Sequence, residues 1–228
     1  MSNIVKNTTI LNPLDLLIPH SCRGCGHVGN VLCDRCKNYI ISTREELCPN
    51  CKAPTKNGIC NFCKNLPPIY YVGPREGLLD TIIHNFKYNS VRALGPKLAE
   101  LLDAILPIDL SNIVTVPLPT TSRHIRARGF DHTMNIAKHL TRLRHYALEP
   151  LLMRTNNFVQ VGADALTREI QASSAYTINP TYTPDPTKTY LLLDDIWTTG
   201  SSMKAAVNEL STAGIKNIII SVLAVSQI

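Results

Sequence analysis

All eight cysteines of this chain fall into four pairs, and the members of each pair are separated by two residues. The pairs are Cys22 with Cys25, Cys33 with Cys36, Cys48 with Cys51, and Cys60 with Cys63. A two-residue gap allows both thiolates of a pair to bind one Zn²⁺, and a tetrahedral structural zinc needs four sulfur ligands. The sequence therefore predicts two zinc sites of four cysteines each. Because sulfur would fill all four positions, neither ion would keep a position for a catalytic water.

The spacing leaves open how the four pairs combine. Sequential pairing, with the first two pairs on one ion and the last two on the other, is the simplest arrangement, and an interleaved one stays open. Disulfides are typical of secreted modules, and residues 1–20 lack the basic segment and apolar run of a secretory signal. Iron–sulfur clusters usually have other ligand spacings. The segment between the pairs is short and polar, so metal would supply most of its folding free energy.

A second chemically distinctive segment is Tyr190–Ser202, with the sequence YLLLDDIWTTGSS. An apolar strand leads to Asp194 and Asp195, and ligands of open parallel sheets bind at the carboxyl ends of such strands. The loop from Thr198 to Ser202 offers N–H groups and hydroxyls to an anion, and the next helix adds its positive N-terminal end. Two carboxylates suit the vicinal hydroxyls of a sugar. The segment therefore fits a phosphate-bearing ribose. Trp197 would either pack over the ribose or fill space in the hydrophobic core.

Positive charge is concentrated between residues 123 and 146. Arg123, Arg126 and Arg128 lie around a glycine-containing loop, and Asp131 is the single acid of this stretch. Arginines on a loop can fold over a pyrophosphate and make bidentate contacts as negative charge develops on it. The sequence therefore indicates a pyrophosphate-binding loop here. The histidines of this stretch are spread along the chain, so we expect most of them at the surface.

The elements that would position these residues follow from hydrophobic periodicity. Helical spacing over 76–106, with a break near Asn89 and Ser90, predicts two helices, and 136–145 predicts another. The runs at 112–116, 190–193 and 217–225, with a helix over 201–213, predict strands of a parallel α/β sheet. Leu66-Pro67-Pro68 marks a boundary. We therefore expect an N-terminal segment with the cysteine module at 1–66 and an α/β domain at 69–228.

Composition agrees with a globular protein. The chain has 228 residues, of which 44% are hydrophobic and 18% charged, and a formal net charge of +6. These values exclude bulk disorder, a collagen-like chain and a membrane-embedded chain. The apolar run at Ile218–Val225 is much shorter than the roughly 20 residues of a membrane-spanning helix. We expect a cytoplasmic protein without membrane insertion, and its charge favours an anionic partner such as phosphate or nucleic acid.

The 190–202 segment resembles the phosphoribosyl pyrophosphate (PRPP) signature of type I phosphoribosyltransferases, where apolar residues precede two acids and a Thr-Gly or Thr-Ser turn. Four cysteine pairs ahead of such a domain resemble the ComF family of bacterial competence proteins. Other stretches are similar to elements of that family and extend the resemblance over nearly the whole chain. They are Phe86-Lys87-Tyr88, Val116-Pro117-Leu118-Pro119, Arg128-Gly129-Phe130, Arg154-Thr155, Gln160 and Arg168.

The resemblance implies a type I phosphoribosyltransferase-like sheet, PRPP bound together with Mg²⁺, and a role in DNA uptake during natural transformation. Asp194, Asp195, Arg123, Arg126 and Arg128 would be the catalytic residues. PRPP would be bound by Asp194, Asp195, Ile196, Trp197, Thr198, Thr199, Gly200, Ser201, Ser202, Pro117, Leu118 and Lys87. The chain departs from the family pattern at Asp131-His132, where Asn-Gln is common, and at Gln171, where Asn is common. The first departure puts a carboxylate beside the arginines.

Two classes of function follow. In the first, the protein is an enzyme that transfers phosphoribose to an acceptor, although the cysteine module occupies the position where such enzymes build an acceptor pocket. In the second, it is a nucleotide-sensing or single-stranded-DNA-binding accessory protein that keeps the PRPP pocket as a ligand site. Aromatic residues in or near basic segments could stack bases. They are Tyr39, Phe62, Tyr70, Tyr71 and Phe130.

Overall fold

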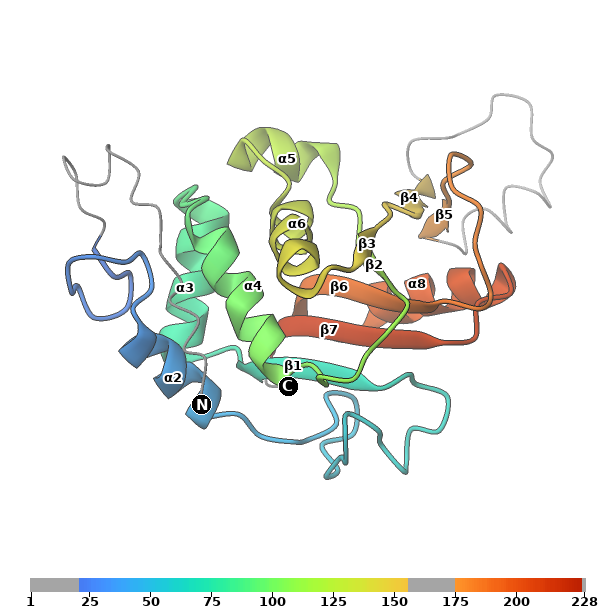
Figure 1. Ribbon diagram of the computed structural model, residues 1–228, viewed down its shortest axis with the longest axis horizontal. Helices are drawn as coiled ribbons and strands as arrows, with labels where there is room; N and C mark the ends of the chain where they lie inside the picture. The colour runs from blue at the N-terminus through green and yellow to red at the C-terminus, as the bar shows by residue number, and fades with distance from the viewer. Residues whose placement is uncertain (1–20, 156–174, 227–228) are drawn as a thin grey trace, which may run out of the picture.

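The computed structural model describes residues 21–155 and 175–226, and a parallel β-sheet forms its centre (Figure 1). In chain order the strands are β1 (Ile69–Pro74), β2 (Ile113–Pro117), β3 (Ala147–Leu148), β4 (Leu152–Arg154), β5 (Tyr176–Ile178), β6 (Thr189–Trp197) and β7 (Ile218–Val225). Five of them form one sheet in the order β1–β7–β6–β2–β3, and every neighbouring pair is parallel. Strands β4 and β5 form a separate antiparallel pair.

Helices cover both faces of this sheet. They are α2 (Asp34–Ser42), α3 (Gly77–Tyr88), α4 (Leu94–Ile105), α5 (Ser122–Arg128), α6 (His132–Arg144) and α8 (Ser201–Thr212). Helices α3, α4 and α6 gather on one side, with α4 against β1 and β7 and α6 against β2 and β6 (Figure 1). Helix α8 and the β4–β5 pair cover the other side. No helix in the two described ranges is long and apolar enough to cross a membrane.

The side chains of β6 alternate between two hydrophobic cores, one on each face of the sheet. Leu191 and Leu193 pack with the helices of the first face, whereas Tyr190 and Leu192 pack with α8 on the other. Successive side chains of a strand point to opposite faces, so an unbroken apolar run can serve both cores. All eight residues of β7 are buried, as expected for a strand in the middle of a parallel sheet.

The predicted fold class, a parallel α/β sheet flanked by helices with a small cysteine-rich segment ahead of it, is confirmed. The two helices expected over 76–106 are α3 and α4, and the strands and helices expected after residue 112 are present. Helix α2 and strands β1, β3, β4 and β5 were not predicted. Helix α5 replaces the loop expected for the arginines, because Thr121 caps its first turn and Gly129 ends it with φ 74°. Strand β6 runs on to Trp197, so Asp194 and Asp195 lie within the strand rather than beyond its end.

The cysteine-rich segment lies along the β1 side of the sheet. Helix α2 packs against α3, α4 and β1, and Ile40 joins the hydrophobic core of that face. Farther along, Leu47 donates its N–H to the Tyr71 hydroxyl, and the N–H of Ile69 donates to the carbonyl of Gly58. The cysteine-rich segment is too short and polar to form a hydrophobic core of its own. Its apolar residues therefore pack against the sheet and the neighbouring helices.

Candidate functional site

The two acids of β6 line a cavity at the carboxyl ends of the central strands. Its volume is about 170 Å³. Asp195 is buried, with its side chain 7% exposed, and Asp194 is partly buried. The residues that line the cavity come from elements that are far apart in the chain. They are Lys87, Leu118, Pro119, Thr120, Thr121, His124, Arg128, His132, Arg154, Tyr176, Asp194 and Asp195.

Asp195 is held by two buried partners from the helices of the first face. Nζ of Lys87, on α3, lies 2.7 Å from Oδ2 of Asp195, and the Lys87 side chain is only 10% exposed. Nε2 of His132, at the start of α6, contacts the same oxygen. A buried charge needs such partners, because desolvation of an unpaired ion costs several kcal/mol or more. The contacts join α3, α6 and β6 at one point beneath the cavity.

Arg128 indicates which nitrogen of His132 carries the proton. Its NH1 atom lies closest to Nδ1 of His132, at 2.9 Å, and 3.3 Å from Nε2. A guanidinium group can only donate hydrogen bonds, so Nδ1 accepts and the proton of a neutral imidazole lies on Nε2. Nε2 then donates to Asp195. His132 therefore connects the guanidinium group of Arg128 to the carboxylate of Asp195.

The environments of the two acids separate their pKa values. Burial raises the pKa of Asp194 to about 8, and the charge of neighbouring Asp195 adds to this shift. Burial would also raise the pKa of Asp195, but the hydrogen bond from His132 and the charge of Lys87 hold it well below its usual range. At neutral pH Asp195 is therefore ionised and Asp194 carries a proton. Pairs of acids with divergent pKa values are typical of functional sites.

The segment that follows β6 turns sharply into α8. Gly200 has φ 74°, and an ideal Cβ there would lie 2.1 Å from the Trp197 ring, so only glycine fits. Trp197 is 1% exposed and packs in the core of the second face, with Ile196 packed against the other core. The side chain of Trp197 thus fills core space. Four exposed hydroxyl residues surround this turn. They are Thr198, Thr199, Ser201 and Ser202.

The turn after β2 forms the opposite wall of the cavity. Pro117, the last residue of β2, is paired with Leu193 of β6, and the N–H of Leu118 donates to the carbonyl of Leu193 at 2.8 Å. This pairing brings the turn at Pro117 and Leu118 next to Asp194 and Asp195. Thr120 donates to Asp131, which also caps α6 through the N–H of Met134. The carboxylate of Asp131 is therefore engaged in local hydrogen bonds with Thr120 and Met134.

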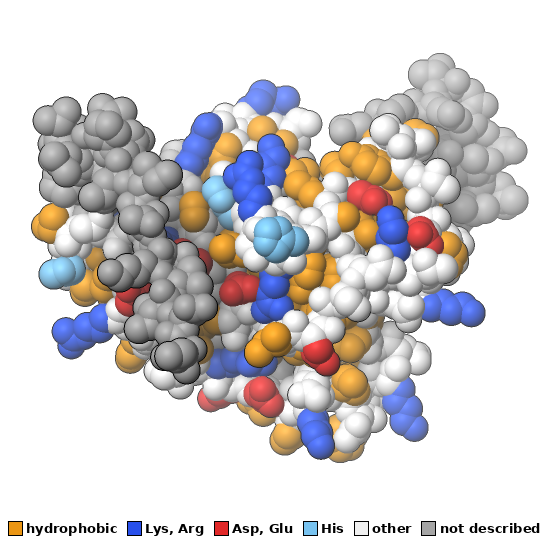
Figure 2. All heavy atoms as spheres, in the orientation of Figure 1, with side chains coloured by type: hydrophobic (Ala, Val, Ile, Leu, Met, Phe, Trp, Pro, Cys, Tyr) orange, Lys and Arg blue, Asp and Glu red, His pale blue; other side chains and the backbone are white. Residues whose placement is uncertain are grey.

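The three predicted arginines separate into two groups. Arg128 lines the cavity of the two acids, whereas Arg123 and Arg126 line a neighbouring cavity of about 500 Å³. Arg154 lines both cavities, and its Nε atom donates to the carbonyl of Pro119 at 2.9 Å. Figure 2 shows Lys and Arg side chains gathered over α5, as the charge pattern of the sequence predicted.

The eight cysteines form two groups, and the predicted sequential pairing is the one observed. The sulfurs of Cys22, Cys25, Cys33 and Cys36 lie within 4.8 Å of one another, and the same holds for Cys48, Cys51, Cys60 and Cys63. All eight are free thiols. Four thiols at this separation match the ligand set of a structural zinc, so either group could hold one ion. The first group is built into the protein core, since Cys22 and Cys36 pack with α3 and α4 residues.

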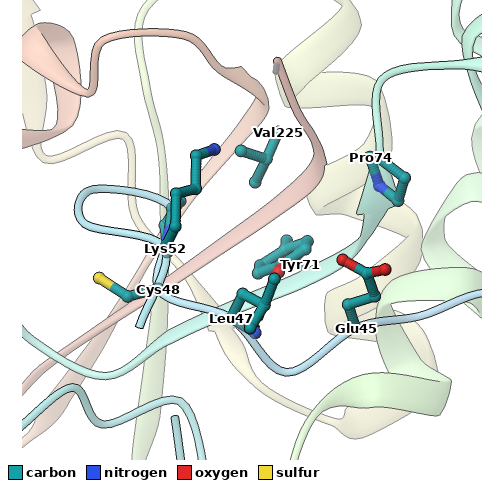
Figure 3. Close-up of a pocket in the computed structure, with 8 residues that line it drawn as sticks. Glu45, Leu47, Cys48, Lys52, Tyr71, Pro74 and Val225 are labelled. Carbon is teal, nitrogen blue, oxygen red and sulfur yellow. Dashed lines mark hydrogen bonds between the residues drawn. The ribbon is translucent and has the colours of Figure 1, made fainter. Parts of the chain in front are cut away.

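The second cysteine group lies close to the turn that begins α8. Asn50, between Cys48 and Cys51, accepts a hydrogen bond from Nζ of Lys204 on α8 at 2.7 Å. Beside this contact, a cavity of about 310 Å³ separates the cysteine segment from the ends of β1 and β7. Figure 3 shows Lys52 and Glu45 on opposite sides of Tyr71 in this cavity. The hydrogen bond between Lys204 and Asn50 links the cysteine segment to the first turn of α8.

Sequence reasoning missed two features of the site. His132, expected at the surface, is 5% exposed because α6 begins there and turns its first residue onto β6. Tyr176 received no role, yet its ring lies 5.3 Å from the guanidinium carbon of Arg154. A signal for the position of His132 was Asp131, a residue type that favours the N-cap of a helix. Gln160, Arg168 and Gln171 lie outside the described residues.

Comparisons with known proteins place few constraints on the chain. No known protein family and no curated protein matches the sequence. Among solved structures, one described as the allosteric regulatory enzyme of purine biosynthesis is similar, with a TM-score of 0.42 and 14% sequence identity. The similarity covers 61% of this chain and 29% of that protein, so the chain spans less than a third of its length.

Proposed function

We propose that the protein binds PRPP with Mg²⁺ in the cavity lined by Asp194 and Asp195. One observation carries the proposal: the acid pair of β6 shares a small cavity with the cations Lys87, Arg128 and Arg154. Acceptor oxygens for sugar hydroxyls therefore lie beside cations for phosphate oxygens, in one place at the carboxyl ends of parallel strands. A phosphoribosyl compound carries both kinds of group.

The proposed orientation follows from the walls of the cavity. The ribose hydroxyls would contact Asp194 and Asp195, and the 5′-phosphate would lie in the hydroxyl-rich turn from Thr198 to Ser202. Backbone N–H groups and the positive end of α8 suit an anion there. The pyrophosphate would lie against the turn at Leu118, near Arg128. Arg123 and Arg126, which line the neighbouring cavity, are not needed for this orientation.

This arrangement suits cleavage of the bond between C1′ and pyrophosphate. The leaving group gains negative charge as that bond breaks, so fixed cations such as Arg128 and Lys87 would lower the barrier electrostatically. Mg²⁺ bound to PRPP would neutralise further charge on the pyrophosphate. Asp195, held by His132 and Lys87, stays ionised beside the ribose, where positive charge develops. The proposed activity is therefore phosphoribosyl transfer to an acceptor that the cavity does not identify.

The resemblance to the ComF family gives this site a biological setting. We propose that the protein acts in DNA uptake during natural transformation, in the cytoplasm, with other uptake proteins or single-stranded DNA as partners. The alternative function is a non-catalytic PRPP or nucleotide sensor. The buried ion pair between Asp195 and Lys87 favours this alternative, because it keeps one of the two acids engaged before any ligand binds.

Calorimetric titration with PRPP and Mg²⁺, with pyrophosphate release measured in the same samples, tests the proposal. We expect binding by the unmodified chain and loss of binding in the double variant Asp194→Asn with Asp195→Asn. Circular dichroism verifies that the variant is folded. Pyrophosphate release in the presence of an acceptor would identify an enzyme, whereas binding without release would identify a sensor. PRPP binding that survives in the double variant would refute the site.

A further inference from the structure

A second cavity adjoins the cavity of the two acids and is lined by a different set of side chains. Its volume is about 500 Å³, larger than the about 170 Å³ of the first. Its lining has three arginines and no carboxylate. The lining residues are Pro119, Thr120, Thr121, Ser122, Arg123, Arg126, Pro150, Leu152, Met153, Arg154 and Asn179.

Helix α5 is the wall between the two cavities. His124 and Arg128, one helical turn apart, line the first cavity, whereas Arg123 and Arg126 line the second. Residues three or four apart share a face of a helix, so α5 presents one basic face to each side. Within the described residues, neither Arg123 nor Arg126 forms an ion pair. Their guanidinium groups are exposed and available to an anion from outside.

The remaining walls define what else the ligand must carry. Met153 and Pro150 give the lining an apolar part, whereas the side chain of Leu152 is buried in the core of the second face. Asn179 already uses its amide to bind the carbonyl of Pro150 and the N–H of Thr181, so it holds the apolar wall in place. Arginines recognise phosphate by bidentate hydrogen bonds. The cavity therefore combines a phosphate end with a weakly polar body.

We propose that this second cavity binds a phosphate monoester of the nucleoside monophosphate class, alongside the ligand of the first cavity. The inference rests on the proposed function and names the class of its second ligand. Arg123 and Arg126 bind the phosphate, and the body of the ligand packs on Met153 and Pro150. Arg154 and the turn Pro119–Thr121 line both cavities, so the two ligands lie next to each other.

The test titrates AMP into the full-length protein by calorimetry, once alone and once with saturating PRPP and Mg²⁺. We expect AMP to bind in both cases, with affinities that agree within about threefold, because separate cavities allow both ligands at once. In the double variant Arg123→Gln with Arg126→Gln, the affinity for AMP should fall by about tenfold or more, because two charge-assisted contacts are lost. Inorganic phosphate, which lacks the body, should bind more weakly than AMP.

Arg142→Gln is the matched control, because this exposed arginine of α6 lines neither cavity and its loss removes one positive charge. Its affinity for AMP should equal that of the unmodified chain. Competition between AMP and PRPP would overturn the inference, since the second cavity would then be part of the PRPP site. Absence of AMP binding, or binding unaffected by the double arginine variant, would also overturn it. AMP binding without PRPP binding would instead refute the proposed function alone.

Discussion

The cysteine groups and the carboxylate cavity are assembled in opposite ways. Each cysteine group takes all its ligands from one short segment, so the spacing of the sequence already contains the site. The cavity takes its lining from α3, the turn after β2, helices α5 and α6, strands β4 and β5, and β6. Only the fold brings these segments together. The comparison shows that the grouping of the cysteines can be predicted from their spacing, whereas the chemical state of residues that come together from many elements cannot.

The largest expected effect separates the two cysteine groups. Cys36 is buried in the core shared with α3 and α4, whereas Cys63 is only partly buried and outside that core. Cys36→Ser should lower the free energy of unfolding by on the order of 5 kcal/mol, because it removes a metal ligand and disturbs the core. Cys63→Ser should cost less. Thermal unfolding of both variants, with zinc analysis of each, measures the difference.

Zinc analysis also tests the premise of that comparison. The unmodified chain should contain about two Zn²⁺, and each variant about one, because four sulfurs are required per ion. Equal loss of stability in the two variants would contradict the different burial of the two groups. Fewer than about one Zn²⁺ in the freshly purified unmodified chain would contradict the zinc assignment altogether.

The next largest effect should come from the buried ion pair beneath the cavity. Asp195→Asn leaves the ammonium group of Lys87, 10% exposed, without its carboxylate. Removal of one partner of a buried pair costs about 3 to 5 kcal/mol. Chemical denaturation measures this loss. Lys87→Met in the same background is the control, and it should restore part of the stability because no unpaired charge remains.

A smaller effect is expected at His132. His132→Leu removes the bridge between Arg128 and Asp195, and loss of a hydrogen bond to a charged group costs about 1.5 to 3 kcal/mol. His132→Gln keeps one acceptor and one donor, so it should retain most of the stability and most of the PRPP affinity. Denaturation and titration of the two variants decide the point. Equal behaviour of Leu and Gln would exclude the hydrogen-bonded bridge.

Sequence reasoning recovered much of the fold, because helical spacing and apolar runs are local signals. It identified α3, α4, α6, α8, β2, β6 and β7, together with the cysteine ligands and the sequential grouping as the simplest choice. It missed α2, which lies between two cysteine pairs, and the short strands β1, β3, β4 and β5. The pairing of Asp195 with Lys87 and His132 could not be predicted, because these residues meet only when α3 and α6 pack on one face of β6. The placement of Arg123 and Arg126 apart from Arg128 depends on α5 being a helix.

The last predicted effect has the opposite sign. The pKa of Asp194 is about 8 in the folded protein and 3.8 as a reference value, so the folded state disfavours its ionised form. The contribution of protonated Asp194 to the free energy of unfolding is fully present below pH 3.8 and is lost as pH rises through about 8. Asp194→Asn cannot ionise, so the variant should be more stable than the unmodified chain, increasingly so from pH 4 to 8.

Melting curves of Asp194→Asn and of the unmodified chain at pH 4, 6, 8 and 9 test this expectation. The difference in melting temperature should grow up to pH 8 and then level off, since titration of Asp194 is complete above its folded pKa. Asp195→Asn, whose carboxyl pKa is held low, is the control and should be destabilised throughout the neutral range. A flat difference for Asp194→Asn would show that Asp194 is ionised in the folded protein. A stable variant that no longer binds PRPP would show that the carboxyl group is retained for binding at a cost in stability.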